Sequence, residues 1–406
     1  MDKRLSLNGV KVIEWTQAVN GPWAAAYLAD FGAEVIKIES TKSPDMGRLT
    51  RPYKDNIPGL DRAHRFLFNN TSKRSFTLDM KQLRGQEIFK RLVKWADIVI
   101  QSQRPGLMKG MSLGYEELRK IKEDIIVLDV SIVGQEGPLV GVGGWASNSM
   151  AQSGQFYFYR FPAGEPLVAG YTGINDAIGP LFVAMAGIAA LDYKRRAGKG
   201  QHLDISQLEP IIHFLGPAIL NFTANGRIQQ PIGNRDPYAA PHNAFRCKGN
   251  DKWCVIAVFT DEEWRDFCRV LGDPVWTKSP KFSTLSTRKE NEDELEQLVN
   301  KWTMQHTPNE VMIMMQEAGV AAGVVQNSQE IVDSDPQVRA RELLIRLHHP
   351  VIGDYLHTRW PFLLSKTPGI IRTAPCIGQD NYYVCTEILG MSSEEFVELV
   401  NSEVII

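Results

Sequence analysis

The side chains able to do chemistry are scattered, and few form a recognised motif. No two of the five cysteines form a CxxC pair; they are Cys247, Cys254, Cys268, Cys376 and Cys385. An odd number of distant cysteines favours reduced, mostly buried thiols in a cytoplasmic protein. The eight histidines are also scattered, and only His348 and His349 are adjacent. No carboxylate–histidine spacing suggests a metal site, so we predict none.

Two phosphate-binding patterns are absent from the sequence. No GxGxxG fingerprint follows the first expected strand, and there is no P-loop. Gly141, Gly143 and Gly144 are close together but lack a strand–turn–helix context, which favours a plain loop. The basic turn 194–200 follows an apolar run and is most simply the solvated end of a helix, where cations are favoured.

One carboxylate has two possible roles. Asp176 stands directly before the long apolar run 177–193. It could cap the N-terminus of the helix expected there. It could also act as a nucleophile, because aspartate has a reference pKa of about 3.9 and is already an anion at neutral pH. Its position alone favours the cap.

Length and composition indicate an ordinary globular protein. The 406 residues suggest two domains or one large one. Hydrophobic residues make up 43% and charged residues 23%, which excludes a disordered, collagen-like or coiled-coil chain. The net charge of −2 does not favour nucleic acid or an anionic membrane as a partner. The N-terminus has no apolar segment typical of a signal peptide. The apolar run 177–191 falls short of the ~18 residues of a membrane span, so we expect a buried helix.

The first 135 residues alternate between strand and helix patterns. Short apolar strands are expected at 10–14, 34–39, 97–101 and 125–132, with helices between them. Nearly continuous apolar strands between helices are typical of a parallel sheet covered on both faces. The predicted fold is therefore α/β, with a doubly wound, Rossmann-like sheet. A ligand would bind at the carboxyl ends of its strands.

The remainder of the chain predicts a second, smaller domain between two linkers. Gly, Pro, Asn and Arg are frequent at 223–245, which indicates an irregular linker. A compact α+β pattern covers 246–325: strands at 253–259 and 319–325, and helices at 261–271 and 291–319. A second linker is expected at 326–340. Residues 341–406 end in an acidic helix at 392–400.

Several segments, in this order and spacing, carry a resemblance to a known family. They are LNGVKVIEWTQAVNGPWAAAYLADFGAEVIKIE, NTSKRSFTLDMK, WADIVIQSQRPGLMKGMSLGYEEL, VSIVGQEGP, MAQSG, INDAIGPLFVAMAGIAALDYKRRAGKGQHLDISQLE and NRDPYAAPHNAFRCKGNDKWCVIAVFTDEEWRDFC. From about residue 7 to the C-terminus, the chain resembles the family III (CaiB/BaiF-type) CoA-transferases, which include formyl-CoA:oxalate, carnitine and benzylsuccinate CoA-transferases.

The resemblance implies an architecture. Residues 1–222 and 341–406, from both chain ends, would form a large Rossmann-like domain, and 246–325 a small α+β domain. The linkers 223–245 and 326–340 would join them into a ring that interlocks with a second subunit. That subunit would be an identical chain or a paralogous one.

The resemblance also implies a reaction. The family's aspartate nucleophile matches Asp176, in TGINDAIGP. This carboxylate would attack an acyl-CoA to give a mixed anhydride, which the CoA thiolate converts into an aspartyl-CoA thioester. An acceptor acid then reverses the sequence. Water must be kept out of the pocket if the acyl bond energy is to be conserved. CoA would be a substrate, with no permanently bound cofactor.

The CoA contacts implied by the resemblance lie in several segments. They are Gln17, Ala18, Val19, Asn20, Lys42, Lys73, Arg74, Arg104, Lys109 and Met111. The chain departs from the family pattern at Gly110, where the family has arginine, and at Ser40, whose basic counterpart is displaced to Lys42.

The acyl pocket of the family is lined by the segment before the nucleophile. The matching residues are Trp145, Phe156, Tyr157, Tyr159 and Arg160. Aromatic rings would suit a bulky or aromatic acid such as benzylsuccinate, with succinyl-CoA as donor, and Arg160 could pair a second carboxylate. A buried aromatic strand with one snorkelling arginine is an equally good interpretation.

Two alternatives to transferase activity remain. α-Methylacyl-CoA racemases resemble the chain over much the same length but carry Gly-His-Asp where this chain has Gly144-Trp145-Ala146. Because indole cannot abstract a proton, racemisation is disfavoured. The other alternative is a non-catalytic, CoA-binding subunit of a heteromeric transferase, against which the retention of Asp176 argues.

Overall fold

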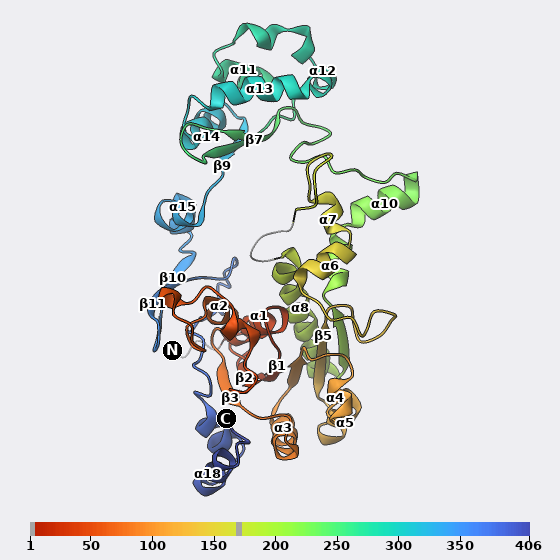
Figure 1. The fold of residues 1–406 in the computed structure, drawn as a ribbon, viewed down its shortest axis with the longest axis vertical. Coiled ribbons are helices and arrows are strands. Elements are labelled where there is room, and N and C mark those ends of the chain that lie inside the picture. Colours follow the sequence, from red (N-terminus) through yellow and green to blue (C-terminus); the bar gives the residue numbers. More distant parts are fainter. Residues whose placement is uncertain (1–4, 168–172) are drawn as a thin grey trace. The chain divides into compact units, whose positions relative to one another are not determined.

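The computed structural model describes residues 5–167 and 173–406. The chain divides into two compact units. The first comprises Met1–Gln155, Val168–Arg227 and Arg339–Ile406, so both ends of the chain contribute to it (Figure 1). The second comprises Phe156–Leu167 and Ile228–Val338.

The first unit is built on a six-stranded sheet in the order β3-β2-β1-β4-β5-β6, with every neighbouring pair parallel. The strands are β1 (Lys11–Trp15), β2 (Glu34–Glu39), β3 (Arg74–Thr77), β4 (Ile98–Gln101), β5 (Ile126–Ser131) and β6 (His202–Ser206). The predicted parallel sheet is confirmed. Strand order reverses between β1 and β4, which is the position where doubly wound sheets bind ligands.

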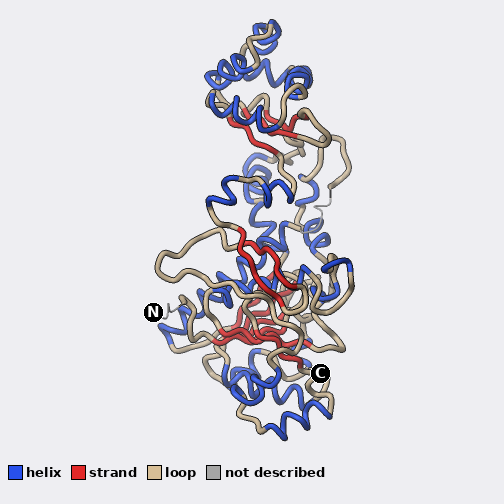
Figure 2. The backbone as a smooth tube through the Cα atoms, turned by 90° about the vertical axis from the view of Figure 1, so that its left-hand side faces the viewer, coloured by secondary structure: helices blue, strands red, loops and turns tan. Residues whose placement is uncertain are grey.

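Helices cover both faces of this sheet (Figure 2). On one face, apolar strand residues pack with α1 (Asn20–Asp30) and α8 (Ile174–Ala197). On the other, they pack with α3 (Leu83–Trp95), α5 (Tyr115–Ile121) and the C-terminal α18 (Ser393–Asn401). Successive strand residues therefore enter opposite cores, and this explains why the strands read as nearly continuous apolar runs.

Helix α8 is longer than the apolar run indicated. Its 24 residues are long and apolar enough to cross a membrane, contrary to our expectation from the sequence. Half of its most apolar window is nevertheless buried in the protein, and Val183, Ala190 and Leu191 belong to the sheet core. Its basic end is only partly solvated, because Lys194 is largely buried and pairs with Asp97 and Asp124 at 2.9 Å each. We therefore describe α8 as a core helix of the first unit.

The second unit has its own core. A three-stranded antiparallel sheet contains β7 (His242–Arg246), β8 (Trp253–Ala257) and β9 (Ala321–Val324). It packs with α11 (Asp261–Val270), α13 (Glu292–Thr303) and α14 (Pro308–Glu317). The single helix expected at 291–319 is thus interrupted, because Thr307 and Glu310 form a capping box that starts a new helix. Helix α11 likewise begins with a capping box, formed by Thr260 and Glu263.

Several elements of the first unit were not anticipated from the sequence, and β3 is one of them. A short helix, α2 (His64–Asn69), precedes β3. An antiparallel hairpin joins β10 (Leu344–His349) to β11 (Gly353–Thr358). The strands of the hairpin alternate between more and less exposed residues, which is typical of a sheet with one face on the core.

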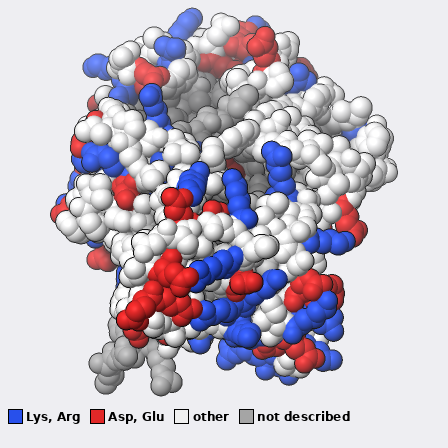
Figure 3. All heavy atoms as spheres, turned by 60° about the horizontal axis from the view of Figure 1, so that its bottom comes forward, with Lys and Arg blue, Asp and Glu red and all other residues white. Residues whose placement is uncertain are grey.

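The thiols and the surface charges fit the composition. All five cysteines are free, and four of them are buried, as predicted. Figure 3 shows acidic and basic side chains intermingled on one face of the molecule. Mixed signs of charge on that face agree with a net charge near zero.

Candidate active site

The carboxyl ends of β1, β4 and β5 open onto a cavity of about 820 Å³ in the first unit. The segments at the ends of these strands line it, at 17–20, 102–105 and 130–133. The glycine-containing segment 143–147 lines it as well, together with Asp176 and Gln207. The cavity therefore lies at the carboxyl edge of the sheet, at the reversal of strand order, where a ligand is expected.

Asp176 lies in the first turn of α8, facing this cavity. The N-cap of the helix is Gly173, and the Asp176 amide donates a hydrogen bond to the Gly173 carbonyl at 2.9 Å. The interpretation of Asp176 as the cap is therefore wrong. Its side chain is only 8% exposed, yet it lines the cavity. The carboxylate is thus accessible from the cavity while bulk water is largely excluded.

Burial controls the charge of this carboxylate. Loss of hydration raises the pKa of Asp176 to about 6, while the positive charge of Arg65 and a hydrogen bond from Asn20 act in the opposite direction. At pH 7 and above, most of the side chain is therefore still ionised. A poorly hydrated anion is a better nucleophile than one fully solvated in water.

The pKa of Asp176 predicts the acid side of the pH profile. Protonation removes the nucleophile, so we expect kcat/KM to fall about tenfold per pH unit below pH 6. Because Arg65 lowers the pKa of Asp176, Arg65→Gln should move this limb to higher pH. Initial rates across a pH series would measure both effects. An acid limb near pH 4 in the wild-type protein would contradict the buried environment of Asp176.

Asn20 connects the loop after β1 to α8. Its Nδ2 donates to Oδ1 of Asp176 at 3.2 Å and to Oε1 of Gln207 at 3.1 Å. The amide fits against α8 only because residue 179 is glycine, since a Cβ there would overlap the Asn20 Oδ1 atom. The glycine in this apolar helix therefore makes room for the residue that orients Asp176.

The loop after β1 is held in an unusual backbone conformation. Ala18 has φ of 68°, a left-handed value that non-glycine residues rarely adopt. Its amide donates to Asp45 Oδ1 at 3.0 Å, and its carbonyl accepts from Asn69 Nδ2 at 3.0 Å. The amide of Gln17 donates to Ser102 Oγ at 3.0 Å, which ties the loops after β1 and β4 together. Strain held in place by surrounding contacts is typical of functional sites.

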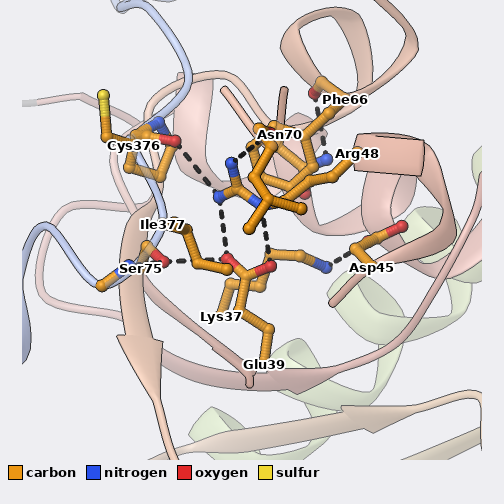
Figure 4. A network of polar contacts seen from close by, with 12 residues as sticks. Lys37, Glu39, Asp45, Arg48, Phe66, Asn70, Ser75, Cys376 and Ile377 are labelled. Carbon is orange, nitrogen blue, oxygen red and sulfur yellow. Dashed lines mark hydrogen bonds and ion pairs between the residues drawn. The ribbon is translucent and has the colours of Figure 1, made fainter. Parts of the chain in front are cut away.

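Buried ion pairs fix Asp45 and, through it, this loop (Figure 4). Lys37 Nζ lies 2.6 Å from Asp45 Oδ2 and 3.0 Å from Glu14 Oε1, with all three side chains fully buried. Arg48 makes two hydrogen bonds of 2.8 Å to the Glu39 carboxylate. Buried charges are costly unless each has its partners, so removing one member should disturb the whole network.

Lys37 should therefore be important for stability. Lys37→Met leaves the carboxylates of Glu14 and Asp45 with less compensation in a buried setting, and we expect a loss of ~3–5 kcal/mol of unfolding free energy. Urea unfolding followed by circular dichroism measures it. Lys42→Met is the matched control, because Lys42 pairs with Glu403 on the surface and should leave the midpoint unchanged. Equal midpoint shifts in the two variants would refute this role of Lys37.

The structure brings together part of the predicted site. The cavity around Asp176 is also lined by Gln17, Ala18, Val19, Asn20, Arg104 and Trp145. Lys109 is exposed on α4 (Leu107–Gly110). Met111 packs against the core that the sheet forms with α3, α5 and α18. Neither of these two residues is among those lining the cavity.

Three cations predicted to contact CoA lie elsewhere. Lys73 is buried, with its Nζ 2.6 Å from Glu14 Oε2 and 2.7 Å from the Pro22 carbonyl, and burial lowers its pKa to about 8. Arg74 pairs with Glu34 and Asp380. Lys42 pairs with Glu403 on the surface. Lys73 and Arg74 are thus part of the fold's own ion-pair network, and their assignment as phosphate ligands stays a prediction.

The aromatic segment before the nucleophile forms neither a strand nor a buried element. Gln155–Phe158 is the short helix α7, and Tyr157 and Tyr159 are 36% and 40% exposed. The Arg160 guanidinium stacks over the Tyr157 ring at 4.6 Å. Phe156, Tyr157, Tyr159 and Arg160 belong to the second unit, whereas Asp176 belongs to the first.

Several residues of the site were not identified from the sequence. Gln207 directly follows β6, so its position at the carboxyl end of a strand could have identified it as a site residue. Ser102 directly follows β4, so the same reasoning applies to it. Arg65 and Asp45 belong to no motif, and only the folded structure brings Arg65 to the cavity and Asp45 to the loop after β1. Within the described ranges 5–167 and 173–406, no three His, Cys, Asp or Glu side chains group as they would around a metal ion.

Comparisons with known proteins agree with this architecture. A model for CoA-transferase family III matches residues 7–381. Succinyl-CoA–D-citramalate CoA-transferase from Chloroflexus aurantiacus is 32% identical over 98% of both chains. Acetyl-CoA:oxalate CoA-transferase from Acetobacter aceti is 33% identical, over 84% of this chain and 85% of its own. The crystal structure of a CaiB/BaiF family protein from Brucella suis superposes with a TM-score of 0.87 at 27% identity, covering 95% of this chain and all of the other.

The matches extend over nearly the whole chain and agree with the parallel sheet. The relatives are transferases that act on CoA thioesters and carboxylic acids, as their names state. The chain therefore belongs to CoA-transferase family III and is a CoA-transferase that acts on acyl-CoA and carboxylate substrates.

Proposed function

We propose that Asp176 is the nucleophile that carries first the acyl group and then CoA. The observation that carries this proposal is a carboxylate 8% exposed that lines the cavity at the carboxyl edge of the sheet. One Asp176 oxygen attacks the thioester carbonyl of the donor, and the carbon–sulfur bond breaks. The products are a mixed anhydride and CoA thiolate.

The thiolate then returns to the aspartyl carbonyl of the anhydride. The donor acid leaves as its carboxylate, and Asp176 is converted into an aspartyl-CoA thioester. A carboxylate oxygen of the acceptor acid attacks that thioester and releases CoA thiolate, which gives a second anhydride. Attack of the thiolate on the acceptor's acyl carbon forms the new acyl-CoA and restores the Asp176 carboxylate. No redox change occurs, and no proton transfer is needed.

The residues around Asp176 support these steps. Asn20 holds one carboxylate oxygen by a hydrogen bond, leaving the other for attack. The amides and side chains of 17–20 would border the thioester and pantetheine, and Arg104 would lie toward the phosphates. Burial of Asp176 keeps water from hydrolysing the anhydride, which would waste the acyl bond.

The relatives suggest substrates for this chain. Succinyl-CoA is the donor named for the citramalate transferase, so we propose succinyl-CoA as the first donor to test. Benzylsuccinate is the first acceptor to test, because it combines a dicarboxylic acid with an aromatic group. Racemisation is not proposed, because Trp145 lines the cavity where racemases have histidine, and indole is no base.

Steady-state kinetics test the proposal. Formation of acceptor-CoA from succinyl-CoA and a panel of acids should follow ping-pong kinetics, with parallel lines when both substrates are varied. The same preparation should exchange labelled succinate into succinyl-CoA without an acceptor, because the anhydride forms reversibly. Intersecting lines without this exchange would contradict a covalent carrier.

We also propose that two subunits interlock through rings formed by the two units and their linkers. A relative of 30% identity is named as the alpha subunit of a succinyl-CoA–L-malate CoA-transferase from Chloroflexus aurantiacus, so a paralogous partner is a second possibility. Native mass spectrometry of the protein expressed alone distinguishes them. A dimer supports the homodimer, and a monomer without activity would favour a missing paralogous chain.

A further inference from the structure

A second cavity, of about 530 Å³, adjoins the one that contains Asp176. Both cavities are lined by Val19 and Arg65, so these two residues form a shared wall. The second cavity lies entirely within the first unit, between α2, the start of α1 and the β10–β11 hairpin. Its volume is within the range of small-molecule sites.

The lining of this second cavity is mainly aromatic and apolar. Trp23 meets Phe68 edge-on at 5.1 Å, and Phe68 stacks on His357 at 5.0 Å. Tyr355 and Leu356 from β11 complete the far side. Burial lowers the pKa of His357, so its ring is uncharged at neutral pH. Such a surface favours a flat or bulky apolar group over a small polar one.

Arg65 gives the cavity a polar end beside the nucleophile. It lines the cavity that holds Asp176, and its charge is close enough to lower the pKa of that carboxylate. The acceptor acid reaches the aspartyl-CoA thioester as a carboxylate, and this charge needs a partner in a cavity that is partly shielded from water. An arginine on the shared wall can supply that partner and hold the acid in a fixed orientation by paired hydrogen bonds.

We propose that the second cavity binds the organic part of the acid substrate, an aryl-substituted or comparably bulky apolar carboxylic acid, while Arg65 pairs a carboxylate of that acid beside Asp176. The inference rests on the proposed function and adds the class of acid to it. It assigns acid selectivity to the first unit, whereas the aromatic segment 156–161 lies in the second.

Two variants of the full-length protein test this assignment. Arg65→Gln removes the charge but keeps a similar side-chain length. It should lower the affinity for the acid substrate by more than about tenfold, because a charge-assisted pair is lost. Leu356→Trp fills the cavity from a residue that is 47% exposed, so the fold should tolerate it. It should lower the affinity for aryl acids by about tenfold but leave the affinity for acetate unchanged. Arg119→Gln, an exposed arginine on α5, is the control.

The primary measurement is calorimetric binding of 3-phenylpropionate to each protein, which needs no turnover. The second measurement is the KM, with succinyl-CoA as donor, for 3-phenylpropionate, benzylsuccinate, succinate and acetate. We expect aryl acids to be preferred to acetate in the wild type, and the KM for succinyl-CoA to stay unchanged in Leu356→Trp. Thermal unfolding of each variant identifies any loss of folding.

Failure of this inference and failure of the proposed function would give different results. If 3-phenylpropionate binds no better than acetate, or if Leu356→Trp lowers the affinity for both acids equally, the cavity does not select the acid. If Leu356→Trp changes the oligomeric state and not acid affinity, a second subunit occupies the cavity, and the assignment is overturned. Failure of the proposed function would appear instead as the absence of a covalent adduct on Asp176 when succinyl-CoA is supplied alone.

Discussion

Asp176→Asn is expected to lower CoA exchange by more than about 10³-fold, because a neutral amide cannot form the anhydride on which every later step depends. The substitution is nearly isosteric, and the side chain is buried beside Asn20, so the fold should persist. CoA binding should remain measurable, since the loops after β1 and β4 are unchanged. Initial rates of succinyl-CoA:acid exchange and calorimetric titration with CoA measure the two properties separately.

Asp192→Asn is the matched control for this variant. Asp192 is on the same helix, but its side chain is 61% exposed and pairs with Arg196 on the surface. Its exchange rate should equal that of the wild type. If Asp176→Asn retained a rate within tenfold of the wild type, or if both variants lost activity together, Asp176 would not be the covalent carrier.

Gly179→Ala should have the second-largest effect. A Cβ at this position would overlap Asn20 Oδ1, and because the obstacle is the end of a side chain, Asn20 rather than the helix should move. Asp176 then loses its hydrogen bond from Asn20, and its pKa should rise further. We expect kcat to fall by about 10–100-fold, in line with the loss of one hydrogen bond to a charged group. The acid limb of the pH profile should move upward.

Gly187→Ala separates this effect from helix propensity. Gly187 is on the same helix, and a Cβ there would make only an ordinary contact, 3.4 Å from Leu128 Cδ2. Alanine in a helix interior is more stable than glycine by ~0.5–1 kcal/mol, so this variant should be at least as stable and fully active. Equal kinetics in Gly179→Ala and Gly187→Ala would show that Asn20 does not orient Asp176.

Strands β1, β2, β4 and β5 of the sheet were predictable from the sequence because they are buried on both faces. Runs such as IIVLDVSI at 125–132 are mostly apolar, and the helix patterns between them favour a parallel sheet covered on both faces. The β10–β11 hairpin was missed because 344–358 alternates only weakly and contains histidines and arginine. Its position in the first unit depends on contacts distant in sequence.

The site was only partly predictable for a related reason. A motif locates a residue along the chain but does not reveal its partners. Lys73 and Arg74 occupy a basic pair that looks exposed in sequence, yet Glu14 and Glu34, far earlier in the chain, hold them in ion pairs. The closeness of Asn20 to Gly179 is likewise a property of helix packing, since about 160 residues separate them.

The measurement that tests the central claim most directly is peptide mass spectrometry of the protein after brief incubation with succinyl-CoA and quenching with hydroxylamine. Hydroxylamine attacks the aspartyl carbonyl of the anhydride or thioester and leaves a hydroxamate on the side chain that carried it. The account predicts a hydroxamate on the peptide containing Asp176, none in Asp176→Asn, and none without succinyl-CoA. A hydroxamate on a different carboxylate, or turnover with no modified peptide, would contradict it.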